Sequence, residues 1–263
     1  MTSRADAIKR IFSAVGPTYD LVNRLLTLGL DVAWRKRAAR LARRGGGRRW
    51  LDVCSGTGDM ARALTRVAPR GVKVTASDFS MPMLRFASRK ATRRPFDRVC
   101  SELPRLPFPD ASFDLATISF ATRNINLDRP ALQECFHEVC RVLRPGGRLV
   151  NLETSQPPNR FLRTLFHLYV RTAVKPLGRA ISGSPSGYAY LSSTIPRFYE
   201  APVLAGILRT SGFERVTYQH DFFGAVAIHT AVKKAEPLSA SGKERRSSGQ
   251  TRGCPPPRLY DIG

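Results

Sequence analysis

The sequence lacks any long hydrophobic run, and this absence argues against an integral membrane protein. No stretch of the 263 residues reaches about eighteen consecutive apolar residues, so no membrane-spanning helix is expected. The N-terminal segment "MTSRADAIKRIFSAVG" has no continuous apolar core and no clear cleavage site, which argues against a secretory signal. Hydrophobic residues nevertheless make up 42% of the chain, enough for one large or two small domains.

Cysteine and histidine are also scarce, and their spacing predicts no metal site. The five cysteines form no Cys-x-x-Cys pair, and the four histidines show no zinc-ligand spacing. We therefore expect reduced thiols, a cytoplasmic location and no resident metal. The cysteines are Cys54, Cys100, Cys135, Cys140 and Cys254.

Acidic residues are few, because 20 Asp and Glu face 43 Lys and Arg, a formal net charge of +23. Such a field attracts polyanions, either nucleic acid, an anionic membrane surface or acidic substrates. A GC-rich genome that tolerates arginine at solvated positions would give the same count. The densest run, Trp34 to Arg49, holds eight cations and no acid. Its helical periodicity favours a basic surface helix facing phosphates. No base-stacking pattern accompanies it, so nucleic acid is not the expected partner.

The chain divides into three parts by composition. Residues 1–45 are expected to form an N-terminal helical lid, and residues 46–234 a single domain with a helical insertion at about 157–210. The segment 235–263 is rich in Ser, Gly, Pro and Arg and nearly free of large apolar residues. It cannot bury enough surface to offset its ordering entropy, so we expect a disordered basic tail.

Strand and helix patterns alternate through the middle part. Such alternation predicts an α/β fold with a doubly wound, mostly parallel sheet that has helices on both faces. "GFERVTYQHDFFGAVAIHTAVKK" reads as two strands joined by a tight turn, which would add an antiparallel C-terminal strand. Other predicted strands are 48–55, 72–79, 113–121 and 148–155, and predicted helices are 59–68, 80–93 and 130–143, the last stopped by Pro145-Gly146-Gly147.

The stretch "LDVCSGTGDMA", Leu51 to Ala61, is a strand, a glycine turn and the start of a helix. Its Gly-x-Gly-x-x-Ala spacing fits a nicotinamide site and an S-adenosylmethionine (SAM) site equally well. Asp78 ends the next strand and could accept the ribose hydroxyls of either cofactor. Asp52 inside the first strand and the later "LRPGGRLV" favour SAM. A third interpretation is that no cofactor binds here, because any doubly wound fold requires glycines at this corner.

Five blocks of the sequence together resemble the ubiquinone/menaquinone biosynthesis C-methyltransferases. The blocks are "YDLVNRLLTLGLDVAWRKR", "LDVCSGTGD", "LPFPDASFDLATISFATRNI", "RVLRPGGRLVNLE" and "GYAYLSSTI", in family order between Ile8 and about Lys234. The resemblance implies a class I SAM-dependent methyltransferase, Rossmann-like, with a seven-stranded sheet and N-terminal helices. It implies methyl transfer to a ring carbon of a polyprenylated quinol.

The resemblance also implies which residues bind the cofactor. Gly56, Thr57 and Gly58 would form the turn, with Thr57 touching the amino-acid end of SAM. Asp78 would hold the ribose. The remaining cofactor positions are Glu102 and Leu103, expected beside the adenine, and Ser119, expected close to the methyl donor. "SELPRLPF" departs from the usual family pattern, as does Cys54-Ser55 before the turn.

Methylation at carbon requires an electron-rich ring, so the enzyme must favour a phenolate and then remove a ring proton. Arg123 and Asn124 follow the fourth strand, where loops face the cofactor in such folds. We expect Arg123 to stabilise the phenolate and Asn124 to hold a water that accepts the proton. Tyr19 would close over the site as a hydrogen-bonding lid. Ordinary alternatives are a surface salt bridge for Arg123 and simple packing for Tyr19.

The segment Asn159 to Gly178 has a wide apolar face among arginines and suits either a membrane-contact lid or a core helix. The preferred substrate is demethylmenaquinol, bound by an enzyme on the inner face of the cytoplasmic membrane, at an anionic lipid surface. Open alternatives are the ubiquinone precursor, another lipid or polyketide, a nucleic-acid methyltransferase and a non-catalytic SAM-binding protein. The sequence determines neither the ring type nor the oligomeric state, and a homodimer is one option.

Overall fold

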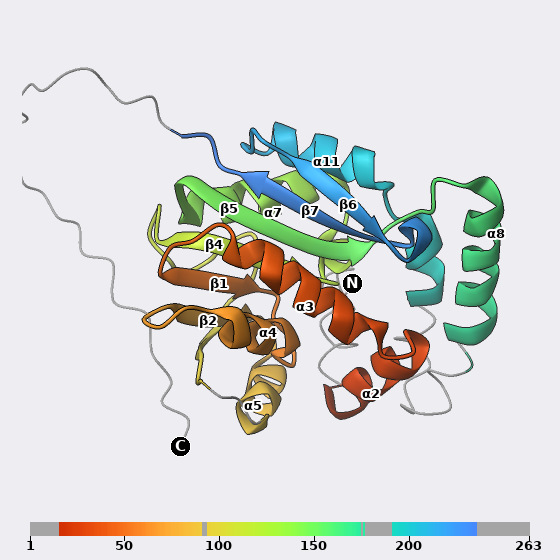
Figure 1. Ribbon diagram of the computed structural model, residues 1–263, viewed down its shortest axis with the longest axis horizontal. Helices are drawn as coiled ribbons and strands as arrows, with labels where there is room; N and C mark the ends of the chain where they lie inside the picture. The colour runs from red at the N-terminus through yellow and green to blue at the C-terminus, as the bar shows by residue number, and fades with distance from the viewer. Residues whose placement is uncertain (1–15, 91–93, 175, 177–190, 236–263) are drawn as a thin grey trace, which may run out of the picture.

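The computed structural model describes residues 16–90, 94–174, 176 and 191–235. A seven-stranded sheet in the order β3-β2-β1-β4-β5-β7-β6 forms its centre (Figure 1). The strands are β1 (Arg49–Val53), β2 (Lys73–Asp78), β3 (Asp97–Cys100), β4 (Phe113–Ser119), β5 (Leu143–Thr154), β6 (Thr217–Asp221) and β7 (Val226–Val232). Strands β1 to β5 pair in parallel, and β7 is antiparallel to both β5 and β6. The predicted fold class and closing hairpin are confirmed.

Helices cover both faces of the sheet, because alternate residues of its buried strands point to opposite sides. Trp50 and Leu51 are neighbours in β1 but belong to two different apolar clusters. The Trp50 cluster packs α3 and α4 against the sheet, and the Leu51 cluster packs α7 and α11 (Figure 1). The helices are α2 (Gly16–Leu26), α3 (Leu30–Arg43), α4 (Asp59–Val67), α5 (Met81–Arg89), α6 (Thr122–Ile125), α7 (Arg129–Val142), α8 (Arg160–Tyr169) and α11 (Ala201–Thr210).

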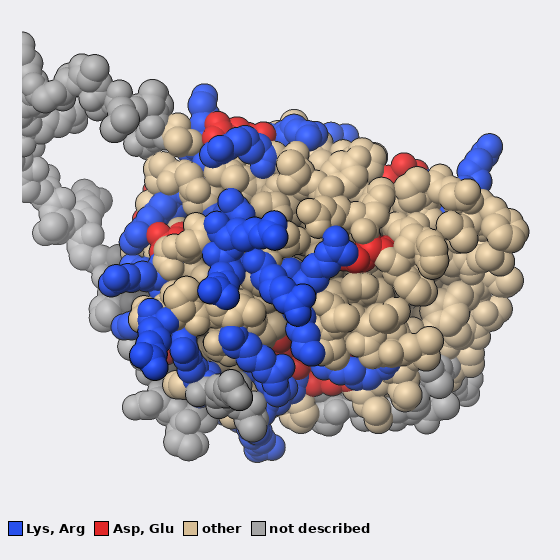
Figure 2. All heavy atoms as spheres, in the orientation of Figure 1, with Lys and Arg blue, Asp and Glu red and all other residues tan. Residues whose placement is uncertain are grey.

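Helix α3 confirms the predicted basic surface helix and also contributes to the core. Its small or aromatic residues Trp34, Ala38, Ala39 and Ala42 are buried, while most cations of the run face solvent. Arg35 is the exception, because it is buried and paired with Asp31. Figure 2 shows Lys and Arg side chains gathered over the middle and left of this face. Within the described part of residues 1–45, α3 packs directly on the sheet, whereas α2 contributes no residue to the two clusters that cover the sheet. The division at residue 45 and the lid role stay predictions.

Some predicted boundaries shift in the structure. Helix α7 ends at Val142, capped at its start by Asp128, whose carboxylate accepts from the Ala131 N–H at 2.8 Å. Strand β5 begins at Leu143 and runs through the Pro-Gly-Gly segment, with a register irregularity opposite β4. Pro145 and its glycines therefore lie in the strand rather than between helix and strand. Strand β3 had no strong sequence signal, because its residues are exposed or half-buried.

The segment after β5 forms α8, followed by a short π-helix, η1 (Val170–Val174). No residue of α8 is buried, so the core-helix interpretation does not describe it. Residues 191–194 are helical and lead into the 3₁₀ turn η2 (Ile195–Arg197), and a second 3₁₀ turn, η3 (Phe222–Gly224), joins β6 to β7. The predicted tail from Ala235 lies outside the described residues, apart from Ala235 itself.

Candidate functional site

The glycine turn lies at the carboxyl end of β1, between β1 and α4. Strand β1 pairs with β2 on one side and β4 on the other, so the chain order of the strands reverses here. Ligands of doubly wound folds bind at such a switch point. Gly56 and Gly58 have φ values of 55° and 77°, a left-handed conformation that favours glycine. The turn is therefore placed and shaped for a ligand.

Asp52 is fully buried and ties the glycine turn to β4. Its carboxylate accepts hydrogen bonds from the hydroxyls of Ser55 at 2.6 Å and Thr117 at 2.7 Å. Burial raises the pKa of Asp52 to about 6, and these two hydrogen bonds oppose the shift. The carboxylate shapes the turn, which explains why an acid occupies a strand interior.

Asp78, at the end of β2, braces the turn from the other side. Its carboxylate accepts from the Gly56 N–H at 2.8 Å and the Ser80 N–H at 2.9 Å. Burial raises the pKa of Asp78, and the two backbone hydrogen bonds oppose that rise. A carboxylate has about four acceptor positions, so Asp78 keeps capacity for ligand hydroxyls.

Helix α2 closes over the turn through polar contacts. The Thr57 hydroxyl donates to the Asp20 carboxylate at 2.6 Å. Lys90 bridges Asp20 at 2.5 Å and Asp59 at 2.8 Å, and Arg24 donates to Asp59 at 2.8 Å. Burial alone would raise the pKa of Asp59, but Lys90, Arg35 and Arg24 hold it below the ordinary value. The sequence patterns did not predict Asp20, Lys90 or Asp59 as residues of the site.

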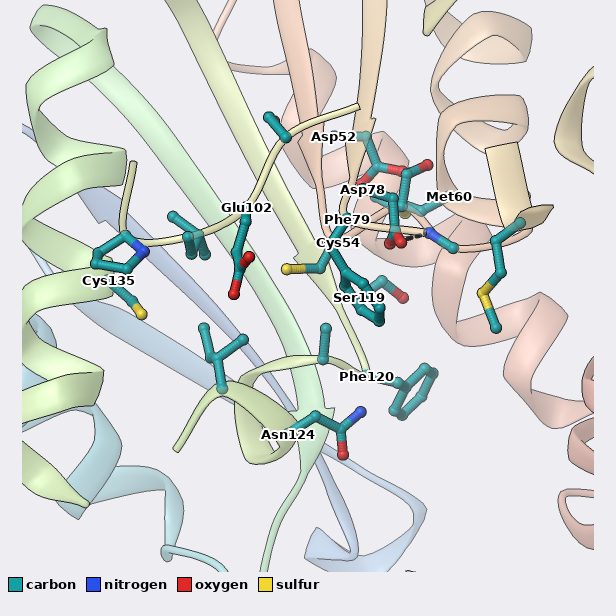
Figure 3. A pocket seen from close by; sticks show the side chains of 18 of the residues that line it. Asp52, Cys54, Met60, Asp78, Phe79, Glu102, Ser119, Phe120, Asn124 and Cys135 are labelled. Atoms are coloured by element: carbon teal, nitrogen blue, oxygen red, sulfur yellow. Dashed lines mark hydrogen bonds between the residues drawn. The ribbon is translucent and has the colours of Figure 1, made fainter. Parts of the chain in front are cut away.

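A cavity of about 280 Å³ extends from the glycine turn between the ends of β1, β2 and β4 and helices α6 and α7 (Figure 3). Its acidic lining residues outnumber the basic ones, although the chain as a whole is strongly basic. The acids are Asp52, Asp59, Asp78, Glu102 and Glu134, and the base is Arg35. Such a lining suits a ligand that carries positive charge.

Seven of the ten predicted site residues line this cavity: Gly56, Thr57, Asp78, Glu102, Leu103, Ser119 and Asn124. Their roles toward a ligand stay predictions. Gly58 does not line it. A Cβ at Gly58 would lie 2.9 Å from the Ala87 Cβ and 3.1 Å from the Phe96 ring, so this glycine is required by packing. Tyr19 lies in α2, but its side chain is outside what the structure describes.

One part of the cavity wall combines apolar side chains with unpaired polar atoms. The Ser119 Oγ and the Asn124 Oδ1 are buried and have no hydrogen-bond partner. Phe120, Ala121 and Ile125 line the cavity beside them. Figure 3 shows Ser119, Phe120 and Asn124 around the same space. A buried polar atom without a partner is costly, so these two atoms are suited to a bound molecule with hydroxyl groups.

Arg123 is placed differently from Asn124. Its guanidinium donates to the Thr194 hydroxyl at 2.7 Å and does not line the cavity. Its backbone N–H donates to the buried Glu153 carboxylate at 3.1 Å, and its Nε is buried without a partner. The side chain is buried, and no acid among the described residues lies within 4 Å of the guanidinium. It therefore forms no surface salt bridge with the part of the chain that the structure describes.

Two cysteines lie at the cavity, and the sequence had not marked them as part of the site. Cys54 follows β1 with φ 54°, and Cys135 lies in α7. Burial raises the pKa of the Cys54 thiol well above its ordinary value and that of Cys135 to about 12. Both thiols are therefore protonated and unreactive at neutral pH. Across the described residues, no cluster of three or more His, Cys, Asp or Glu could hold a metal ion.

The fold and the site together define a class I SAM-dependent methyltransferase. SAM carries a ribose and a cationic sulfonium, which fit the carboxylate at Asp78 and the acidic lining. Two solved structures share the fold. A SAM-dependent methyltransferase from Thermotoga maritima has a TM-score of 0.55 at 19% identity, covering 86% of this chain and all (100%) of that chain. Human N-acetylserotonin methyltransferase, solved with SAM, has a TM-score of 0.56 at 15% identity, covering 83% of this chain and 58% of that chain.

Sequence comparison identifies the family: the chain belongs to the ubiE/COQ5 methyltransferase family, which it matches over residues 1–233. A demethylmenaquinone methyltransferase of Thermus thermophilus is 41% identical over 221 residues, covering 83% of this chain and 98% of the relative. A ubiquinone/menaquinone biosynthesis C-methyltransferase of Desulfotalea psychrophila is 35% identical, covering 88% and 92%. The protein is thus a SAM-dependent C-methyltransferase, and its family implies a quinol substrate.

Proposed function

We propose that this enzyme methylates the ring of demethylmenaquinol and so produces menaquinol. The observation that carries the proposal is the pair of unpartnered polar atoms, Ser119 Oγ and Asn124 Oδ1, in an otherwise apolar wall. A flat aromatic ring with hydroxyl groups matches this combination of apolar contact and hydrogen bonding. Relatives named demethylmenaquinone methyltransferase, at 41% and 38% identity, support a naphthoquinol ring over the benzoquinol precursor of ubiquinone.

The residues of the turn fit the cofactor and would hold it. Bound SAM supplies an electrophilic methyl group on a sulfonium. Gly56 and Thr57 would approach its amino-acid end, Asp78 its ribose, and Glu102 with Leu103 its adenine. Supporting this assignment, all five residues line one continuous cavity.

Asn124 would act on the quinol hydroxyl. Its free Oδ1 can accept a hydrogen bond from a water that lies beside the quinol hydroxyl. That water would take the hydroxyl proton, and the negative charge left on the phenolate would make the ring carbon nucleophilic. A water held by the same side chain would then take the proton displaced from the ring carbon. The Ser119 hydroxyl would orient the second polar group of the ring or the end of the cofactor.

Arg123 and Tyr19 keep their proposed roles. Arg123 does not line the cavity, so its proposed effect is electrostatic, through a buried cation next to Asn124 in the sequence. The nearby Glu153 carboxylate opposes that effect. Tyr19 would contribute from α2, which already contacts Thr57 through Asp20.

Three broader proposals concern the molecule around the site. Residues 1–45 would act as a lid, 46–234 as the methyltransferase domain with its insertion at about 157–210, and 235–263 as a dispensable basic tail. An anionic membrane surface on the cytoplasmic side would be the working location. No helix among the described residues is long and apolar enough to cross a membrane. We also propose that the enzyme forms a homodimer.

Replacing Asn124 tests the proposed chemistry. We expect Asn124→Ala to lower kcat about 100-fold while SAM affinity stays within about twofold, because the lost group faces the quinol hydroxyl. Turnover and SAM binding, measured by calorimetry, separate the two effects. Asn126→Ala is the matched control, since Asn126 contacts Tyr199 and does not line the cavity. Full turnover in Asn124→Ala would contradict the assignment.

A further inference from the structure

Three separate segments expose large apolar side chains at one end of the molecule. We define the apolar end by six residues: Leu25 within α2 and Leu28 just after it, Phe161 and Leu165 in α8, and Phe222 and Phe223 in η3. Their exposed fractions are 44% and 87%, 70% and 46%, and 52% and 73%. Phe161 and Leu165 are four residues apart, as are Leu21 and Leu25, so each helix presents a coherent stripe.

The apolar end lies at the same edge of the sheet as the glycine turn. Thr154, at the carboxyl end of β5, pairs with Val226 at the start of β7, which places η3 at that edge. The three segments are also joined. The Tyr169 hydroxyl donates to the Leu26 carbonyl at 2.5 Å, and a Cβ at Gly224 would lie 2.5 Å from Pro158. In Figure 1, α8, η3 and α2 occupy the right-hand end.

The backbone at this end is strained as well as exposed. Leu28, Phe222 and Phe223 have φ values of 50°, 45° and 54°. This left-handed region is unfavourable for bulky residues, and glycine or asparagine would adopt it at lower cost. Large apolar side chains there gain little from the folded monomer, since most of their surface faces water. Residues that are both strained and exposed point to a partner.

A row of aromatic rings links this end to the cavity. The centroids of Phe223 and Phe222 are 5.8 Å apart, those of Phe222 and Trp34 6.0 Å, and those of Trp34 and Phe120 6.2 Å. Phe120 lines the cavity. The surface at the end of the molecule is therefore in continuous contact with the wall of the site.

The charges around the apolar end suit anionic head groups. Helix α8 contains Arg160 and Arg163 and no acid. Three acids on or beside the neighbouring elements are paired: Asp20 with Lys90, Asp221 with Arg37 and Glu200 with Arg163. Figure 2 shows this right-hand end as mostly uncharged, with the dense cations on the middle and left. The cations of α3 lie mostly away from the apolar end.

From this arrangement we infer that the apolar end docks into the surface of a lipid bilayer. Phe161, Leu165, Phe222 and Phe223 enter the boundary between head groups and acyl chains, as the apolar side chains of interfacial helices do. The exposed Arg160 of α8 remains at the level of the phosphates, while Arg163 stays paired with Glu200. Docking would place the site next to the membrane phase from which a lipophilic quinol arrives. This part of the inference rests on the proposed function, whereas the docking itself does not.

Vesicle flotation of the full chain tests the docking. One set of vesicles is pure phosphatidylcholine, and the other contains roughly one-third phosphatidylglycerol. The test variant is Phe161→Gln/Leu165→Gln/Phe223→Asn, in which glutamine keeps the helix and asparagine tolerates the left-handed backbone. The control is Val203→Gln/Tyr218→Gln, which removes two other exposed hydrophobic side chains, 44% and 39% exposed, from α11 and β6. Turnover of a short-tailed quinol in detergent is measured for every protein.

The wild type and the control should bind both kinds of vesicle, and they should bind the anionic vesicles more tightly. The triple variant should bind about tenfold less to both while keeping its turnover in detergent. Equal binding by the triple variant would overturn the inference.

Binding of the wild type to anionic vesicles alone, released by salt, would instead assign the contact to the basic face of α3. A change in oligomeric mass by light scattering, with vesicle binding intact, would assign the apolar end to a second copy. Flotation without turnover on any quinol would refute the proposed function and leave the docking in place.

Discussion

At the scale of single residues, Asp52 connects the glycine turn to β4. Its buried carboxyl group holds the hydroxyls of Ser55 and Thr117, and burial raises its pKa from 3.8 to about 6. In the unfolded chain the carboxyl loses its proton near the ordinary value. Between these two pKa values the folded state binds a proton that the unfolded state does not. The contribution to stability is therefore complete below about pH 4 and is lost as the pH rises through about 6.

We predict that Asp52→Asn removes this pH dependence. Relative to the variant, the wild type should lose up to about 3 kcal/mol of unfolding free energy between about pH 4 and pH 7. Urea unfolding of both proteins at several pH values measures the difference, which cancels contributions from other groups. Parallel curves for the two proteins would show that the carboxyl titrates normally.

At the scale of elements, the glycine turn has two glycines with different functions. Gly56 lines the cavity, whereas Gly58 caps α4 and lets it approach α5 and Phe96. The contacts of α2 with the turn are polar and run through Asp20, Lys90 and Asp59. The positions of these elements therefore depend on a few identifiable atoms.

Gly58→Ala and Gly71→Ala separate packing from backbone strain. Both glycines have left-handed φ values, 77° and 81°, but a Cβ at Gly71 would meet nothing within 4 Å. We expect about 1 kcal/mol of destabilisation for Gly71→Ala and about 1–3 kcal/mol more for Gly58→Ala, which also overpacks Ala87. Thermal or chemical unfolding gives both values. Equal losses in the two variants would argue against the packing role.

Lys90→Met should loosen α2. The substitution leaves Asp20 and Asp59 without the ammonium that joins them, so we expect about tenfold faster amide exchange in Asp20–Leu26 and unchanged exchange in α7. Arg144→Met is the matched control, because it breaks a 2.8 Å ion pair with Asp114, which lies outside the cavity lining. If α2 exchanges as slowly in Lys90→Met as in the wild type, the bridge does not hold the helix.

At the scale of the whole molecule, the sequence predicts the features that follow from periodic patterns of residues. It does not predict the features that depend on how distant segments pack together. Strand patterns and the glycine turn predicted the sheet, the switch point and the position of Asp78, because these follow from periodicity and chain order. Contacts between distant segments could not be predicted in this way. No pattern marks Asp20 as the partner of Thr57, and nothing in the sequence turns Arg123 toward Thr194 while Asn124 lines the cavity. The sequence predicts only a tight turn at Phe222-Phe223, because neither the exposure of these side chains nor their left-handed backbone follows from a sequence pattern.

The distribution of surface types gives the molecule an orientation. On the face drawn in Figure 2, cations gather over the middle and left, and several exposed aromatic and aliphatic side chains lie on α2, α8 and η3 at the right-hand end of Figure 1. The cavity opens from the same edge of the sheet as the apolar end. The proposed chemistry on a lipophilic ring and the inferred contact with a bilayer would therefore involve one end of the fold.

The most direct test of the central claim is a methyl-transfer assay with the purified full chain. Labelled SAM is mixed in detergent with reduced, short-tailed demethylmenaquinone, and in parallel with the corresponding benzoquinol precursor. We predict label in the menaquinol product, at a rate clearly above that for the benzoquinol, and its loss in Asn124→Ala. Transfer to the benzoquinol alone would reverse the choice of ring. No transfer to either quinol, with SAM bound, would contradict the proposed substrate.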